Sequence, residues 1–174
     1  MKADLGIVHD KFVLENSGLV LLWPFLPQLF QQLNLLKDKR FNSEAEALHA
    51  VGLLEYLVSG HKDILIGNLF LNKLLCNIPY NYQIEKPKIL TIAEAEECDT
   101  LLNNVISNWK ALKNTSIDGL RHTFLKRRGE LQLEEKAVLK IEACSIDVLL
   151  DSLPWNISII NLPWMDIALY VDWI

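Results

Sequence analysis

The stretch Leu131–Ala143, LQLEEKAVLKIEA, is where the periodicity of the chain changes. Leu131 and Leu133 alternate with polar residues, and a two-residue alternation returns from Val138 to Ala143. A period of two is typical of a half-buried β-strand, because successive side chains point to opposite faces of a sheet. Glu135 and Lys136 lie between the two runs and suit a turn. The stretch therefore predicts a β-hairpin.

Upstream of this hairpin the hydrophobic pattern has a helical period. Ser43 followed by Glu46, and Thr91 followed by Glu94, are both capping boxes, which mark the start of a helix. The first helix is expected to end at Gly60 and the second near Trp109 or Leu112. We expect the second helix to bury Ala95, Cys98, Leu101, Leu102, Val105, Ile106 and Trp109.

Three weaker helical patterns lie around these two. Pro24 suits the first turn of a helix that runs to about Leu35, and a shorter helix is expected over 69–76. A further helix is expected to start at Thr115 or Ser116. Extended chain is expected at 12–14, before the first helix, and an irregular connector over 78–90, where two prolines discourage regular structure.

Downstream of the hairpin, a short helix over 145–152 precedes two β-like runs at 155–160 and 167–173. Helices first and strands last indicate the α+β class. The sequence thus predicts a bundle of about five helices followed by a small antiparallel sheet of about four strands. We expect one domain over 1–174, helical over about 15–126 and rich in β-structure over about 130–174.

Composition and motifs exclude several kinds of protein. A net charge of −5 argues against nucleic-acid binding by phosphate neutralisation. Three widely spaced cysteines suggest neither a disulfide framework nor a metal site, and the four histidines share no metal-ligand spacing. No glycine-rich phosphate loop or nucleophile elbow is present. We therefore expect no catalytic residues, no metal, no cofactor and no membrane insertion.

Two patterns leave the choice between structure and function open. Asp147 and Asp151 are four residues apart, so they share a helix face that suits acid/base work or the solvent side of an amphipathic helix. An enzyme or a small-ligand binder would bring Lys113, Asp118, Arg121 and Asp147 into one cleft.

Tryptophan is joined to proline three times, in Trp23-Pro24, Leu153-Pro154-Trp155 and Leu162-Pro163-Trp164. Rigid aromatic corners of this kind serve either as core residues or as anchors for a partner, since tryptophan is enriched at interaction hot spots. The sequence does not decide between the two.

Taken together, the motifs resemble those of the tape measure proteins of phage-tail-like contractile injection systems. The matching strings cover nearly the whole chain and keep the order of the family. They are ENSGLVLLWPFLPQLFQQLNLL (15–36), LNKLLCNIP (71–79), WKALKNTSIDGLRHTFLKRRGEL (109–131) and IDVLLDSLPWNISIINLPWM (146–165).

The resemblance implies an assembly factor rather than an enzyme. Members of this family are thought to occupy the lumen of the inner tube, to set its length and to attach at the baseplate and spike end. It implies protein partners among the tube, baseplate or spike components, action in the bacterial cytoplasm during assembly, and a place inside the assembled particle. A cytosolic assembly chaperone is the alternative. The residues expected to contact a partner are Trp23, Phe25, Arg121, Trp155 and Trp164, with Asn114 and Asp118 as ordering groups.

Length limits what this chain is expected to measure. A single helix of all 174 residues would span only about 260 Å, and a compact fold has a radius of gyration of about 16 Å. Larger members of the family carry long additional segments. We therefore expect either a terminal domain of a longer ruler or a small paralogue with a docking role.

Overall fold

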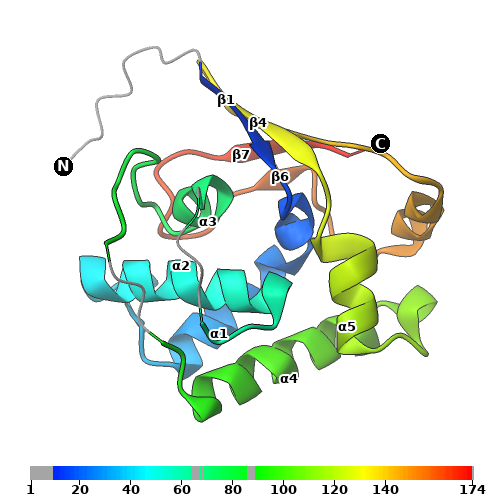
Figure 1. The fold of residues 1–174 in the computed structure, drawn as a ribbon, viewed down its shortest axis with the longest axis horizontal. Coiled ribbons are helices and arrows are strands. Elements are labelled where there is room, and N and C mark those ends of the chain that lie inside the picture. Colours follow the sequence, from blue (N-terminus) through cyan, green and yellow to red (C-terminus); the bar gives the residue numbers. More distant parts are fainter. Residues whose placement is uncertain (1–9, 64–66, 68, 86–88, 174) are drawn as a thin grey trace.

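The computed structural model of the chain describes residues 10–63, 67, 69–85 and 89–173. It has the predicted α+β class, with a five-stranded sheet on one side of the molecule and the two longest helices on the other (Figure 1). The strand order is β1-β4-β5-β7-β6. The strands are β1 (Asp10–Leu14), β4 (Gly129–Leu133), β5 (Ala137–Ile141), β6 (Ile159–Ile160) and β7 (Leu169–Asp172).

The predicted hairpin is confirmed. β4 and β5 pair antiparallel with Leu131 opposite Leu139, and residues 134–136 form the turn. Leu131 and Leu139 are buried, whereas their neighbours Gln132 and Lys140 are more exposed. Burial therefore follows the two-residue alternation that the sequence shows.

Two parts of the predicted sheet are wrong. The sheet has five strands rather than four, because the extended segment before the first helix adds to it as β1, antiparallel to β4. The sheet is mixed rather than antiparallel, because β5 and β7 run parallel. A parallel pair needs a long crossover, and the segment between Ile141 and Leu169 supplies it. The helices consequently lie between strands in the sequence and do not all precede the sheet.

The two helices predicted from capping boxes are confirmed. α2 (Glu44–Ser59) begins after Ser43, whose hydroxyl accepts the Ala45 N–H, and ends at Gly60 with φ +74°. α4 (Ile92–Asn108) begins with the complete Thr91–Glu94 capping box. All seven residues predicted to be buried on this helix and at its end are buried.

The helix predicted from Pro24 to about Leu35 takes a different form. Residues Ser17–Phe25 form a 3-10 helix, η1, and the α-helix α1 (Leu26–Gln32) starts only after it, with Pro27 in its first turn. Asn34 has φ +58°, a left-handed conformation that ends the helix. The predicted helix therefore ends at Gln32, and residues 33–35 are not helical.

The remaining elements are short. α3 (Phe70–Leu75) lies where a helix was expected, and α5 (Ile117–Leu120) begins after the Ser116 cap. The short helix over 145–152 is a 3-10 helix, η4 (Ser145–Ser152), and a two-stranded sheet joins β2 (Leu36–Lys37) to β3 (Arg40–Phe41). The other elements are the 3-10 helix η2 (Lys110–Leu112) and the π-helix η3 (Arg121–Leu125).

Buried residues from the helices and from the sheet form one cluster. Leu19, Leu22 and Leu26 from η1 and α1 are fully buried, as are Leu54 of α2 and Leu102 of α4. The hydrophobic run that includes η1 thus lies at the centre of the core. In the described part of the chain, no helix is long and apolar enough to span a membrane.

Candidate partner-binding surface

Two of the three tryptophan–proline corners meet on one surface. The rings of Phe25 and Trp155 lie 5.1 Å apart in an edge-to-face arrangement. Trp23 is two residues from Phe25 on η1 and also contacts the 155–156 segment. We call Trp23, Phe25 and Trp155 the aromatic surface. The fold thus brings together three of the residues that the sequence predicted for partner contact.

Hydrogen bonds to main-chain carbonyls hold both tryptophans of the aromatic surface. Nε1 of Trp23 donates to the carbonyl of Asn156 at 2.8 Å, and Nε1 of Trp155 donates to the carbonyl of Leu21 at 2.9 Å. These two bonds join segments more than 130 residues apart in the sequence. All three aromatic side chains are only half-buried. Aromatic groups that are held rigidly and still partly exposed are typical of interaction hot spots.

A shallow cavity of about 50 Å³ adjoins Phe25 between α1 and α4. Half of its lining residues are uncharged and polar, namely Gln28, Gln32, Thr100 and Asn104, and the others are Glu97 and three apolar residues. Small-molecule sites usually enclose several hundred Å³. This cavity therefore suits one inserted side chain of a protein partner better than a ligand.

The third corner lies elsewhere. Trp164 is 2% exposed, and its Nε1 donates to the carbonyl of Leu75 at 2.7 Å. Its ring packs against Phe30 and Phe41, with centroid distances of 5.5 and 5.1 Å. Trp164 thus has a structural role in the isolated chain, and its contact with a partner stays a prediction.

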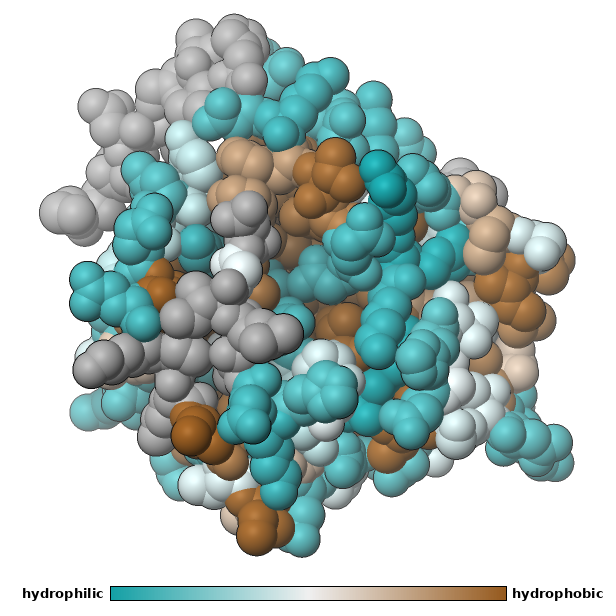
Figure 2. Space-filling view, in the orientation of Figure 1, coloured by the Kyte–Doolittle hydropathy of each residue, from teal (hydrophilic) through white to brown (hydrophobic). Residues whose placement is uncertain are grey.

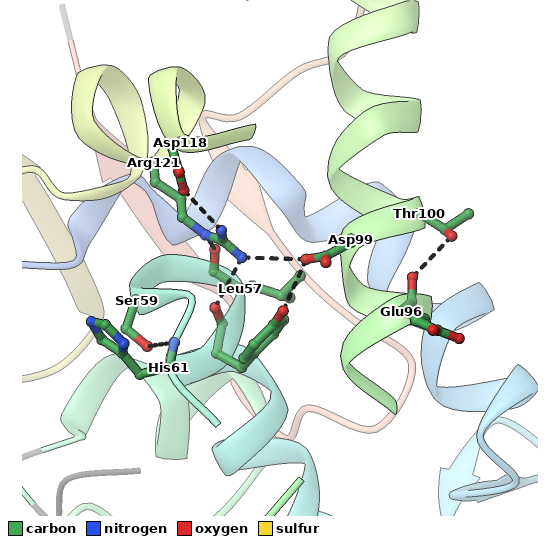
Figure 3. A network of polar contacts seen from close by, with 9 residues as sticks. Leu57, Ser59, His61, Glu96, Asp99, Thr100, Asp118 and Arg121 are labelled. Carbon is green, nitrogen blue, oxygen red and sulfur yellow. Dashed lines mark hydrogen bonds and ion pairs between the residues drawn. The ribbon is translucent and has the colours of Figure 1, made fainter. Parts of the chain in front are cut away.

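Arg121 is the most connected of the predicted contact residues, and Figure 3 shows its surroundings. Its side chain is 8% exposed, and Nε donates to the carbonyl of Leu57 at 3.1 Å. Nη2 approaches the carbonyl of Tyr56 at 3.5 Å. These carbonyls belong to the last turn of α2, where backbone acceptors lack helical partners and a cation is favourable. Arg121 therefore caps α2.

Two carboxylates from different helices complete this network. Asp118 of α5 lies 3.2 Å from Nη1, and Asp99 of α4 lies 3.5 Å from Nη2 (Figure 3). Asp99 also accepts the Tyr56 hydroxyl at 3.1 Å, and burial together with this bond raises the pKa of Tyr56. The network ties α2, α4 and α5 together. Asp118, with a side chain 80% exposed, is its most accessible member, and Asn114 is exposed as well.

The four residues that an enzyme or ligand binder would need do not share a cleft. Asp118 and Arg121 belong to the α2 cap, Lys113 is exposed, and Asp147 lies in a separate cluster. None of the four lines the cavity beside Phe25, the cavity beside Phe12 and Tyr80, or the cleft beside Val13 and Glu55. Among the described residues, no group of histidine, cysteine and acidic side chains could hold a metal; His9 lies outside these residues. The arrangement disfavours a catalytic interpretation.

The cluster around Asp147 is not predicted from the sequence. The spacing predicts that Asp147 shares a helix face with Asp151, for acid/base work or on the solvent side, but Asp147 is 2% exposed and forms a bidentate pair with Arg127, at 2.6 and 2.9 Å. Burial opposes its ionisation, yet hydrogen bonds from Arg127, the Cys144 N–H and Trp173 outweigh burial and lower the pKa of Asp147 to about 2. The arrangement is structural, because it joins the start of η4 to the chain before β4.

Comparison with known proteins gives one match. The model of a family described as contractile injection system tape measure protein matches residues 3–173. No curated protein and no solved structure matches the chain.

Proposed function

The chain belongs to the contractile injection system tape measure protein family, and we propose that it is a non-enzymatic component in the assembly of such a particle. In this proposal it binds a tube, baseplate or spike protein in the bacterial cytoplasm while the particle forms. By anchoring there it contributes to assembly or to control of tube length.

The aromatic surface is the observation that supports an anchoring role. Trp23 and Trp155 are held by hydrogen bonds to main-chain carbonyls, Phe25 packs edge-to-face against Trp155, and all three residues stay partly exposed. A partner that covers them gains buried apolar area without ordering flexible side chains, which lowers the entropic cost of binding. Asn114 and Asp118 are exposed and available for polar contacts at a second position.

Deletion of the gene with complementation tests the proposed function. We expect the deletion strain to give fewer particles, or particles whose tube lengths vary, and the wild-type gene to restore both. The readouts are particle yield and the distribution of tube lengths in electron micrographs. Unchanged yield, tube length and composition would contradict the proposal.

Mass spectrometry of purified particles separates a resident component from an assembly chaperone. A resident anchor remains in the particle at a fixed ratio to a baseplate or spike protein. A chaperone is needed for yield but absent from mature particles. If particle yield depends on the gene but the chain is found only in the cytosolic fraction, the chain is an assembly chaperone and not an anchor.

A further inference from the structure

A second surface, which shares no residue with the aromatic one, lies where β1 meets the end of α2 and the start of α3. It is a cleft of about 460 Å³ whose walls include Val13, Leu14, Glu55, Leu69 and Lys126. Figure 2 shows this face of the molecule hollowed beside β1 and α3, with hydrophobic residues on part of the rim. The cleft is large enough for a long side chain.

The cleft lies against the edge of β1 rather than against one of its faces. Val13 and Leu14 are consecutive, so their side chains point to opposite faces of the strand, yet both line the cleft. No residue of β4, which pairs with the other edge of β1, lines it. The cleft therefore opens at the outer edge of the sheet.

This outer edge is unpaired in the described part of the chain. β1 is the first strand in the sheet order, and the backbone of Asp10–Leu14 pairs only with β4 there. Val13 is 59% exposed. A strand edge of this kind presents free N–H and C=O groups to which another extended chain can add.

Glu55 places a carboxylate with few hydrogen-bond partners in the wall of the cleft. Its carboxylate has one long hydrogen bond, 3.4 Å from Nδ2 of Asn72, and among the described residues it forms no ion pair. Burial raises the pKa of Glu55, with the Asn72 bond and the charge of Lys126 acting in the opposite direction. An ionised carboxylate has about four acceptor positions, so the described residues leave most of those of Glu55 unused.

The side-chain amide of Asn72, which donates to Glu55, is itself fixed by two other hydrogen bonds. Asn72 is fully buried; its Nδ2 also donates to the carbonyl of Val51 at 3.3 Å, and its Oδ1 accepts from Asn16 at 2.8 Å. Asn72 has no further donor with which to satisfy Glu55. A cationic group that enters from the open side of the cleft would supply the missing donors and the opposite charge.

We infer that an extended segment of a protein partner adds to the outer edge of β1 and places a lysine or arginine side chain against Glu55. Main-chain hydrogen bonds along β1 provide the pairing, and the carboxylate selects the basic residue. The inference takes the origin of the partner, a component of the particle, from the proposed function. The two rest on different surfaces and can fail separately.

Binding of peptides from the particle tests the inference. Overlapping 15-residue peptides that cover the tube, baseplate and spike proteins are titrated with the wild-type chain and with Glu55→Gln. We expect a small set of peptides to bind, each with a lysine or arginine, and Glu55→Gln to weaken them at least tenfold. Replacing that basic residue of the peptide by norleucine should weaken its binding to the wild-type chain as much as Glu55→Gln does. The same replacement should weaken its binding to the Glu55→Gln chain little further.

Two controls test whether binding depends on Glu55 and on the edge of β1 in particular, rather than on the negative charge of the cleft. Glu15→Gln removes another carboxylate of the same cleft, one whose side chain is 75% exposed and lies 3.7 Å from Arg128, and should change binding less than twofold. Methylation of alternate backbone nitrogens in a bound peptide should abolish binding if it pairs with β1. Thermal unfolding of Glu55→Gln verifies that the variant is folded.

The inference is overturned if no peptide binds, if Glu55→Gln and Glu15→Gln have the same effect, or if the methylated peptides bind unchanged. If one of these results is obtained and the deletion strain still fails to assemble particles, the proposed function stands and only the β1 site is wrong.

Discussion

At the scale of single residues, Arg127 and Arg128 show how little of their roles the sequence could predict. They are adjacent and, with Lys126, look like a small basic cluster. Arg127 is buried against Asp147, whereas Arg128 is 56% exposed and approaches Glu15 and Glu142 at 3.7 and 3.3 Å. The distinction depends on a carboxylate 20 residues away that η4 holds in place. Local pattern does not contain that information.

We expect Arg127→Met to destabilise the chain strongly and Arg128→Met to do so weakly. Removing one partner of a buried pair typically costs about 3–5 kcal/mol, because the other charge stays buried, whereas an exposed pair contributes less than about 1 kcal/mol. The measurement is urea unfolding of both variants at neutral pH. Equal losses would show that Asp147 is not buried with Arg127 as described.

The lowered pKa of Asp147 predicts a loss of stability in acid. The carboxyl group has a pKa of about 2 in the folded chain, below the value of about 3.9 for an unfolded aspartate. Its contribution to the free energy of unfolding is therefore complete above about pH 4 and is lost as the pH falls toward 2. We expect Asp147→Asn to be less stable at pH 7 and to lose less stability over that range. A carboxyl carbon that titrates near pH 4 by NMR would contradict this.

Arg121 and Asp118, which the sequence placed in one contact site, have different surroundings. Arg121 is buried and bonds the carbonyl of Leu57, so we expect Arg121→Met to cost about 1.5–3 kcal/mol in unfolding experiments. Asp118, exposed at the end of that network, should tolerate Asp118→Asn with a loss of less than about 1 kcal/mol. A large loss for Asp118→Asn and none for Arg121→Met would reverse these assignments.

At the scale of elements, the sequence predicts best where local chemistry decides. α2 and α4 begin and end near the predicted residues because Ser43, Gly60 and Thr91 act through bonds or angles within a few residues of themselves. The 3-10 helix η1 was not predicted, since its residues are apolar almost throughout and a helical period alone does not distinguish the two helix types. β1 was expected only as extended chain, because its partner β4 lies more than 110 residues away.

The cap of α4 can be tested within the helix itself. Thr91 accepts the Glu94 N–H at 3.2 Å, whereas Thr100, also exposed, bonds only the Glu96 carbonyl. We expect Thr91→Ala to cost about 1 kcal/mol and Thr100→Ala to cost nothing measurable, because only the first leaves a helix-end donor unsatisfied. Chemical denaturation of both variants measures the difference. Equal effects would show that the cap does not stabilise the helix.

At the scale of the whole molecule, the candidate surface exists only in the folded chain. The sequence singled out Trp23, Phe25 and Trp155 separately, through their chemistry and their neighbouring prolines. Their meeting depends on the crossover between β5 and β7, which carries Trp155 to η1. Trp164 has the same local pattern but lies in the core. Motif and family resemblance thus identified the class of protein, while tertiary packing decided which corner remains accessible.

The most direct test of the central claim is the amount of this chain in purified particles when the aromatic surface is altered. The deletion strain is complemented with the wild type, with Phe25→Ala, or with Ile92→Ala, which truncates a side chain that is 68% exposed and lies at the start of α4. Thermal unfolding first verifies that both variants fold. We then expect mass spectrometry to find at least tenfold less Phe25→Ala chain per particle, or fewer particles, because a hot-spot side chain contributes about 2 kcal/mol or more to binding. Ile92→Ala should match the wild type. Folded Phe25→Ala at the wild-type level, in particles of normal yield and tube length, would contradict anchoring through the aromatic surface.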